Sequence, residues 1–181
     1  MNLEKYQQYS RIARGLEKAD LVLKDARIVN VFTEEIIRGD IAIQDGIIAG
    51  IGSFHGKEER DLAGRYVCPG FIDSHLHLES TLVTPAELVT AASRHGTTTF
   101  IVDPHESANV SGLAGIDYIL DQTEDVKANV YVMMPSCVPA TAIDDNGCTL
   151  TAEDMVPYLH NSRILGLGEV MDSISVVQGE K

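Results

Sequence analysis

The second half of the chain alternates apolar segments with amphipathic ones, and this alternation limits the possible folds more than any other feature. Short β-branched runs predict strands at residues 67–77, 97–103, 129–134 and 164–171. The segments between them show helical periodicity at about 85–95, 112–122 and 152–160. We expect Thr84 with Glu87 to form a capping box before the first of these helices, and Thr151 to Asp154 to cap the last. Because the predicted strands are almost continuously apolar, we expect a parallel sheet that is covered by helices.

Ionisable residues distinguish between the two folds that this pattern allows, a doubly wound sheet and part of a (β/α)8 TIM-type barrel. Such residues cluster at the carboxyl ends of three predicted strands, at His75/His77, at 103–106 and at Glu169. In a barrel these ends meet at one mouth, whereas in an open sheet they spread along an edge. No Gly-x-Gly-x-x-Gly follows the first strand, which disfavours a dinucleotide-binding sheet. We therefore predict an α/β chain with about four βα units of a barrel, in residues 67–181.

Residues 1–66 have a different character, and we predict a separate small module there. Residues 2–18 read as a short amphipathic helix, with Leu3, Tyr6, Ile12 and Leu16 as its apolar stripe. Short alternating strands follow, and Asp45-Gly46 predicts a hairpin turn. Several short strands with turns between them favour a β-sandwich-like module. A polar stretch at 53–65 forms the expected boundary to the barrel portion.

Two histidines at the end of the first barrel strand form the strongest candidate for a metal site. His75 and His77 are two residues apart, so on a strand their rings point to the same side. Imidazoles that converge are natural ligands of divalent transition metals. Asp73 has the same parity and could orient a histidine from behind. An isolated His-x-His is more often a pair of surface histidines, but the preceding Pro-Gly turn and Asp73 favour a ligand role.

Glu169, at the end of the fourth predicted strand, is the candidate third ligand. A carboxylate has two oxygens and could bridge two metal ions about 3.5–4 Å apart. A metal-bound water loses a proton near neutral pH and becomes a nucleophile, so Glu169 is also a candidate catalytic residue. The alternative is a solvated loop carboxylate, although its position after an apolar strand makes unpartnered burial costly.

Four further residues are weaker candidates. His105 and Glu106 either take a catalytic part in the site or cap the following loop. Asp103, before Pro104, either orients a ligand or forms a turn. Glu79 lies just past the first strand and would contact substrate or solvent.

Composition excludes several classes of protein. The 27 acidic against 14 basic residues give a net charge of −13, which argues against a nucleic-acid-binding surface. No apolar run is long enough to cross a bilayer, and no signal peptide is recognisable, so we expect no membrane association and a cytoplasmic location. Three widely spaced cysteines fit reduced thiols rather than disulfides or a structural zinc site. A nucleophile elbow and a Walker loop are both missing from the sequence.

Several motifs together resemble the amidohydrolase superfamily and, within it, the microbial adenine deaminase family. The motifs are Pro69-Gly-Phe-Ile-Asp-Ser-His-Leu-His-Leu-Glu-Ser80, Asp103-Pro-His-Glu106, Met134-Pro-Ser-Cys-Val-Pro139 and Gly166-Leu-Gly-Glu-Val-Met171. The resemblance implies hydrolysis of the purine base adenine to hypoxanthine and ammonia, by a metal-activated hydroxide that attacks the amino-bearing ring carbon. It makes His75 and His77 ligands, with Glu169 as the bridging group in place of the carboxylated lysine of many relatives.

The resemblance also implies a binuclear centre of Mn²⁺ or Fe²⁺, with Zn²⁺ as the alternative, and a homo-oligomer in the full-length form. In the family, strands five to eight supply further histidine ligands and a proton-transferring aspartate, and we expect these beyond Lys181.

Two other interpretations stay open. The chain could belong to another amidohydrolase, such as an N-acetylglucosamine-phosphate deacetylase or a cyclic-amide hydrolase, or it could be an inactive remnant or half-barrel interaction module.

Overall fold

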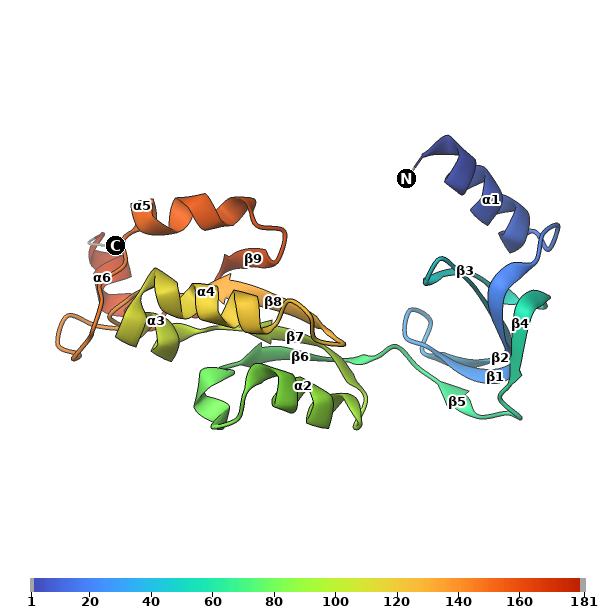
Figure 1. The fold of residues 1–181 in the computed structure, drawn as a ribbon, viewed down its shortest axis with the longest axis horizontal. Helices are drawn as coiled ribbons and strands as arrows, with labels where there is room; N and C mark the ends of the chain where they lie inside the picture. Colours follow the sequence, from blue (N-terminus) through green and yellow to red (C-terminus); the bar gives the residue numbers. More distant parts are fainter. Residues whose placement is uncertain (1, 180–181) are drawn as a thin grey trace. The chain divides into compact units, whose positions relative to one another are not determined.

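A computed structural model describes residues 2–179, and Figure 1 shows its helices and strands. The chain divides between Pro69 and Gly70 into two compact units, which are described here one at a time. In the part of the chain that is described, no helix combines the length and the apolar character that a membrane crossing requires.

The first unit contains a five-stranded sheet. Its strands are β1 (Ala19–Asn30), β2 (Glu35–Gln44), β3 (Ile47–Gly52), β4 (Gly56–Asp61) and β5 (Tyr66–Val67). The order is β3-β2-β1-β4, and β5 pairs with the later part of β1. β2 is antiparallel to both of its neighbours, whereas β4 and β5 run parallel to β1. The hairpin between β2 and β3 turns at Asp45 and Gly46, whose φ angles of 51° and 75° match the type I′ turn that Asp-Gly predicts.

The sandwich-like arrangement expected for this unit was wrong for the described residues, because the strands form one sheet instead of two facing sheets. Alternating apolar residues indicate that one face of a strand is more apolar than the other, but they do not indicate which element covers that face. Helix α1 (Leu3–Ala13) covers part of one face, where Ile12 packs with Val22, Ala42 and Phe54. A second cluster contains Ala26, Ile28 and Ile41, with Leu62 and Val67 against it.

The apolar stripe predicted for the first helix was also wrong in part. Ile12 is fully buried, but Leu3, Tyr6 and Leu16 are each more than 60% exposed. The helix is shorter than predicted, since it ends at Ala13 and leaves Leu16 in the following loop. One turn of the helix therefore anchors it to the sheet.

The second unit contains a parallel sheet of four strands, which confirms the parallel α/β prediction. The order β6 (Phe71–Leu76), β7 (Thr97–Val102), β8 (Asn129–Met134) and β9 (Ile164–Leu167) follows the sequence. The helices of this unit are α2 (Pro85–Ser93), α3 (His105–Ser111), α4 (Leu113–Gln122), α5 (Ala152–Met155) and α6 (Ser173–Gln178). Two 3₁₀ segments, η1 (Glu79–Thr81) and η2 (Val156–His160), complete it.

One face of this sheet carries the main core. Alternate strand residues Phe100, Val102, Val130, Val132 and Met134 are buried in a single cluster with residues of α2, α3 and α4. The intervening residues, such as Thr99 and Ile101, are only half-buried. Because a doubly wound sheet has helices on both faces, the one-sided core favours the wall of a barrel.

The predicted helix caps can be compared with the caps in the structure, and only one of the two is present. The predicted cap at Thr151 is present as a capping box, with Asp154 Oδ2 2.8 Å from both the backbone N and the Oγ1 of Thr151. Thr84 lies at the N-cap of α2, but its side chain makes no capping hydrogen bond, so the capping box expected there was wrong. Helices α3 and α6 were not predicted, since they are only seven and six residues long.

Candidate metal centre

The carboxyl ends of β6 and β9 bring together the three residues predicted as ligands. Glu169 Oε1 lies 3.9 Å from His75 Nε2 and 3.5 Å from His77 Nε2. The two imidazole rings are nearly perpendicular, with centroids 4.9 Å apart. β6 ends at Leu76, so His77 lies one residue beyond the strand. The sequence separates these ligand candidates by about ninety residues, yet the parallel sheet places them at one edge.

The donor atoms fit a divalent cation better than they fit one another. Both histidine-to-glutamate separations are too long for hydrogen bonds. Two ligands at about 2.1 Å from a tetrahedral ion lie about 3.4 Å apart, close to the separation of His77 Nε2 and Glu169 Oε1. Two imidazole nitrogens with one carboxylate form a donor set that suits zinc, iron or manganese.

Asp103 accepts a hydrogen bond from the backbone of Glu169. Its side chain is fully buried, and Oδ2 accepts a hydrogen bond from the Glu169 backbone N at 3.1 Å. Its own backbone N donates to Leu76 O at 2.9 Å, so Asp103 connects the ends of β6, β7 and β9. Burial raises the pKa of the Asp103 carboxyl, against the hydrogen bond from Glu169. Asp103 thus contacts the main chain of the ligand segment.

Gly168 and Ser136 complete this support, and the sequence reasoning missed both. A Cβ atom on Gly168 would lie only 2.0 Å from Asp103 Oδ2, so the position has no room for a side chain. Ser136 Oγ donates to Glu169 O at 2.5 Å from the end of β8. The signal that could have found Ser136 is its place just after a buried parallel strand, where barrel sites are built.

Glu79 is hydrogen-bonded to the start of α3. Its Oε1 accepts hydrogen bonds from the backbone N atoms of Glu106 and Ser107, at 3.1 and 3.2 Å, in the first turn of α3. Its Oε2 is buried with no hydrogen-bond partner among residues 2–179. Burial raises the pKa of Glu79, and the nearby Glu106 carboxyl also acts to raise it. The substrate-binding role of Glu79 stays a prediction.

Glu106 lies beside His77, on the side of the ring away from Glu169. Glu106 Oε2 is 3.0 Å from His77 Nδ1, and the Glu106 side chain is about half exposed. Burial raises the pKa of Glu106, but the combined effect of hydrogen bonds and the nearby His77 and His105 lowers it overall. The residues His77, Glu79 and Glu106 form a second group whose ligand atoms lie within 4.8 Å of one another.

The other two predicted residues have distinct environments. His105 is only 6% exposed, and within the described chain neither ring nitrogen has a hydrogen-bond partner. Asp73 Oδ1 accepts from the backbone N of His75 at 3.4 Å, so the contact that the structure gives it is with main chain. The catalytic role of His105 and the ring-orienting role of Asp73 therefore stay predictions.

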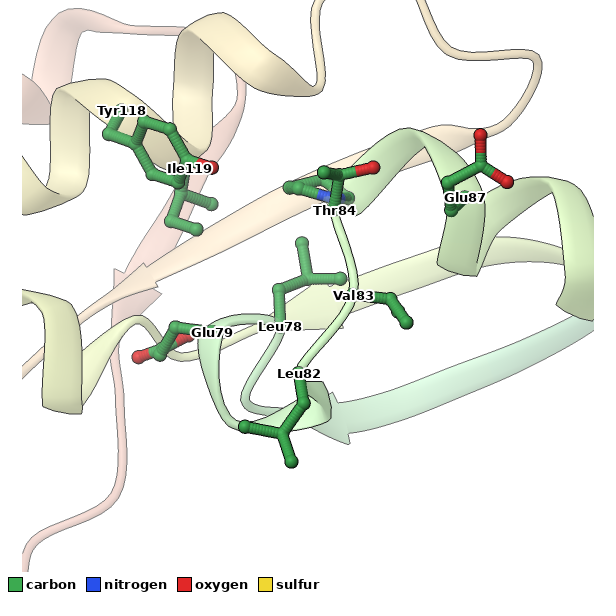
Figure 2. Close-up of a pocket in the computed structure, with 9 residues that line it drawn as sticks. Leu78, Glu79, Leu82, Val83, Thr84, Glu87, Tyr118 and Ile119 are labelled. Carbon is green, nitrogen blue, oxygen red and sulfur yellow. The ribbon is translucent and has the colours of Figure 1, made fainter.

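Two cavities of the second unit lie outside the three-ligand cluster. One, of about 490 Å³, lies between Glu79 and the start of α2. Figure 2 shows Glu79 and Glu87 at its opposite ends, with Leu78 and Val83 between them. The other, of about 750 Å³, has a mainly apolar lining from the β8 and β9 ends, the 138–142 loop and α5. Neither is lined by His75, His77 or Glu169.

This chain is similar to several known proteins. Residues 66–171 match the model of the amidohydrolase family. An adenine deaminase of Desulfitobacterium hafniense is 57% identical to this chain, in an alignment that covers the whole chain and 32% of the deaminase. An adenine deaminase of Clostridium acetobutylicum is 50% identical, in an alignment that covers 93% of this chain and 30% of the deaminase. Among solved structures, an N-acyl-D-glutamate deacylase of Bordetella bronchiseptica, complexed with zinc and a phosphonate inhibitor, matches with a TM-score of 0.54. That match has 20% identity and covers 77% of this chain and 34% of the deacylase.

The structural match shows a partial TIM-barrel-like α/β fold. The chain spans about a third of the length of the curated relatives that it matches. The family match covers more than half of the chain and includes all the candidate ligands. The chain therefore belongs to the amidohydrolase family.

Proposed function

We propose that this chain forms part of a metal-dependent hydrolase that converts adenine and water to hypoxanthine and ammonia. The observation that carries the proposal is the cluster of His75, His77 and Glu169 at the carboxyl edge of a parallel sheet. Support for the substrate comes from relatives named adenine deaminase, which are 45–57% identical over the whole of this chain.

In this proposal His75 and His77 would hold a divalent metal through Nε2, together with the carboxylate of Glu169. A divalent metal supplies hydroxide near neutral pH, because it lowers the pKa of a water that it binds. Mn²⁺ or Fe²⁺ is the expected metal, with Zn²⁺ as the alternative. Asp103 and Ser136 keep the Glu169 backbone fixed at both its N and its O. A fixed ligand loses little conformational freedom when the metal binds, which favours binding.

The reaction also needs groups that move protons to the departing ammonia. Glu106, at 3.0 Å from His77, is one candidate, and His105, which precedes it in the same helix, is another. Since the matched relatives are about three times as long as this chain, we expect further ligands and proton-transferring groups from outside these residues.

Adenine turnover and metal content test the proposal together. A protein that extends this chain to the length of its relatives should deaminate adenine after loading with Mn²⁺, and the 181-residue chain alone should not. His75→Ala and His77→Ala should each abolish turnover and reduce bound metal. His160→Ala is the matched control, because His160 is an exposed histidine of the same unit outside the cluster.

Three results would contradict the proposal in different ways. Full activity of the 181-residue chain would show that the site is complete without further residues. Unchanged metal content in His75→Ala and His77→Ala would remove their ligand role. Turnover of a cyclic amide or an N-acetylated amino sugar phosphate, but not of adenine, would keep the metal site and replace the substrate.

A further inference from the structure

His77 has different partners for its two ring nitrogens. Nε2 faces Glu169 at 3.5 Å, within the cluster proposed to bind the metal. Nδ1 faces Glu106 Oε2 at 3.0 Å. A neutral imidazole carries a proton on one nitrogen only, and the hydrogen bond made by that nitrogen determines which one it is. The surroundings of Nδ1 thus decide whether Nε2 is free to bind a cation.

The environment of Nδ1 favours a proton there. Nδ1 is buried, and the part of the chain described by the structure offers it no aligned hydrogen-bond partner. A buried polar atom without a partner costs about 1–3 kcal/mol. The nearest acceptor is the Glu106 carboxylate, 3.0 Å away on a side chain that is about half exposed. A proton on Nδ1 would satisfy both groups.

Glu79 fixes the position from which Glu106 acts. It is two residues after His77, and its neighbour Leu78 is buried in the core. Glu79 Oε1 accepts from the backbone N atoms of Glu106 and Ser107, which ties the start of α3 to the His77 segment. The histidine and the helix that carries Glu106 are therefore held to the same short piece of chain.

We propose that Glu106 is a positioning residue for His77: it accepts the Nδ1 proton, keeps Nε2 unprotonated, and is itself positioned by Glu79. This inference rests on the proposed function, since it assigns Nε2 to the metal. Carboxylates that orient metal-binding histidines in this way typically change metal affinity by 10–100-fold. In this role Glu106 acts through the histidine.

The competing arrangement is a separate cation held directly by His77 Nδ1, Glu79 and Glu106, whose ligand atoms are close enough for one. In that arrangement Nδ1 would have to be unprotonated. Glu79 Oε1 already accepts two backbone hydrogen bonds, so in that arrangement only Oε2 would be left for the cation. The two arrangements predict opposite protonation of the same nitrogen.

Nuclear magnetic resonance of the metal-free chain separates these arrangements. Long-range ¹H–¹⁵N spectra of the histidine-labelled 181-residue chain, at a pH where histidines are neutral, report the tautomer of each ring. His77, assigned from the signal lost in His77→Gln, should carry its proton on Nδ1. Glu106→Ala should remove this preference, and Glu106→Gln should restore it, since an amide oxygen also accepts. Glu124→Ala, an exposed carboxylate of the same unit, and the His75 signals are the controls.

A proton on His77 Nε2 in the unsubstituted chain would overturn the inference, as would identical His77 signals in Glu106→Ala. Zn²⁺ binding, measured by competition with a chromogenic chelator, provides the second readout. Glu106→Ala should weaken affinity by 10–100-fold without changing the number of ions bound. Loss of one ion per chain at unchanged affinity for the rest would instead support direct ligation and overturn it. Should the unsubstituted chain bind no Zn²⁺, the metal-free spectra still decide the role of Glu106, and the proposed function is decided separately by adenine turnover of the extended protein.

Discussion

Gly168 offers a sharp test of how the candidate centre is built. A Cβ atom at this position would lie 2.0 Å from Asp103 Oδ2 and 2.8 Å from Asp103 Cγ. Asp103 is fully buried, so any movement of its carboxyl would take place inside the protein. Gly168→Ala must therefore displace a group that accepts the hydrogen bond from the backbone N of Glu169. We expect both stability and metal binding to suffer.

The magnitude follows from two costs. Overpacking a buried position costs about 1–3 kcal/mol, and leaving a buried hydrogen-bonding group unsatisfied costs about 1–3 kcal/mol. We expect the free energy of unfolding to fall by about 3 kcal/mol. For a urea dependence of about 2 kcal/mol per molar, the unfolding midpoint falls by about 1.5 M.

Gly166→Ala is the matched control, because it makes the same substitution two residues earlier on β9. Its nearest neighbour would be Met133 Cε at 3.7 Å, an ordinary contact, so we expect a change within about 0.5 kcal/mol. Urea unfolding of both variants, with Zn²⁺ affinity measured alongside, provides the comparison. Equal midpoints for Gly168→Ala and Gly166→Ala would refute the reasoning. In an Asp103→Ala background, the cost of Gly168→Ala should shrink by about 1–3 kcal/mol, since the two groups contact directly.

Two further predictions concern stability. Burial raises the pKa of Asp40, but hydrogen bonds from Lys24 Nζ and two backbone N atoms outweigh it and hold the pKa below its usual range. This stabilisation is therefore present above the unfolded pKa of about 3.9 and is lost as the pH falls through the lower folded value. Asp40→Asn should cost about 2 kcal/mol at pH 7 and flatten the acid limb of a thermal-unfolding profile; an unchanged acid limb would contradict this. Arg163 donates to Leu120 O at 2.8 Å, near the C-terminus of α4, and to Val130 O at 3.1 Å. Arg163→Lys should lower the free energy of unfolding by about 1–2 kcal/mol in urea titrations, because an ammonium does not reproduce the guanidinium fork; full stability would show that charge alone suffices.

Local chemistry determined the features that the sequence predicted well. The Asp45-Gly46 turn needs two residues with positive φ, and the Thr151 cap needs only a partner three residues away. The parallel sheet follows from apolar strands separated by helices, and its topology brings His75 and Glu169 to one edge. These features depend on neighbours in sequence or on a general rule of chain connection.

The features that the sequence did not predict depend on contacts between distant segments. Glu79 accepts from backbone N atoms 27 and 28 residues later, and backbone donors leave no trace in residue identity. Gly168 looks like an ordinary strand glycine until the position of Asp103 is known. Periodicity likewise identified an apolar stripe on α1 without indicating that only Ile12 would find a partner surface. In each case the missing information was tertiary proximity.

The long strand β1 has a consequence for the dynamics of the first unit. It pairs with β2 along one edge and with β4 and then β5 along the other, so only β3 is attached through a different strand. Opening β1 would break three ladders at once, whereas β3 can detach by breaking one. Amide hydrogens in the middle of β1 should therefore exchange with solvent only when this sheet opens as a cooperative unit, and those of β3 through smaller openings.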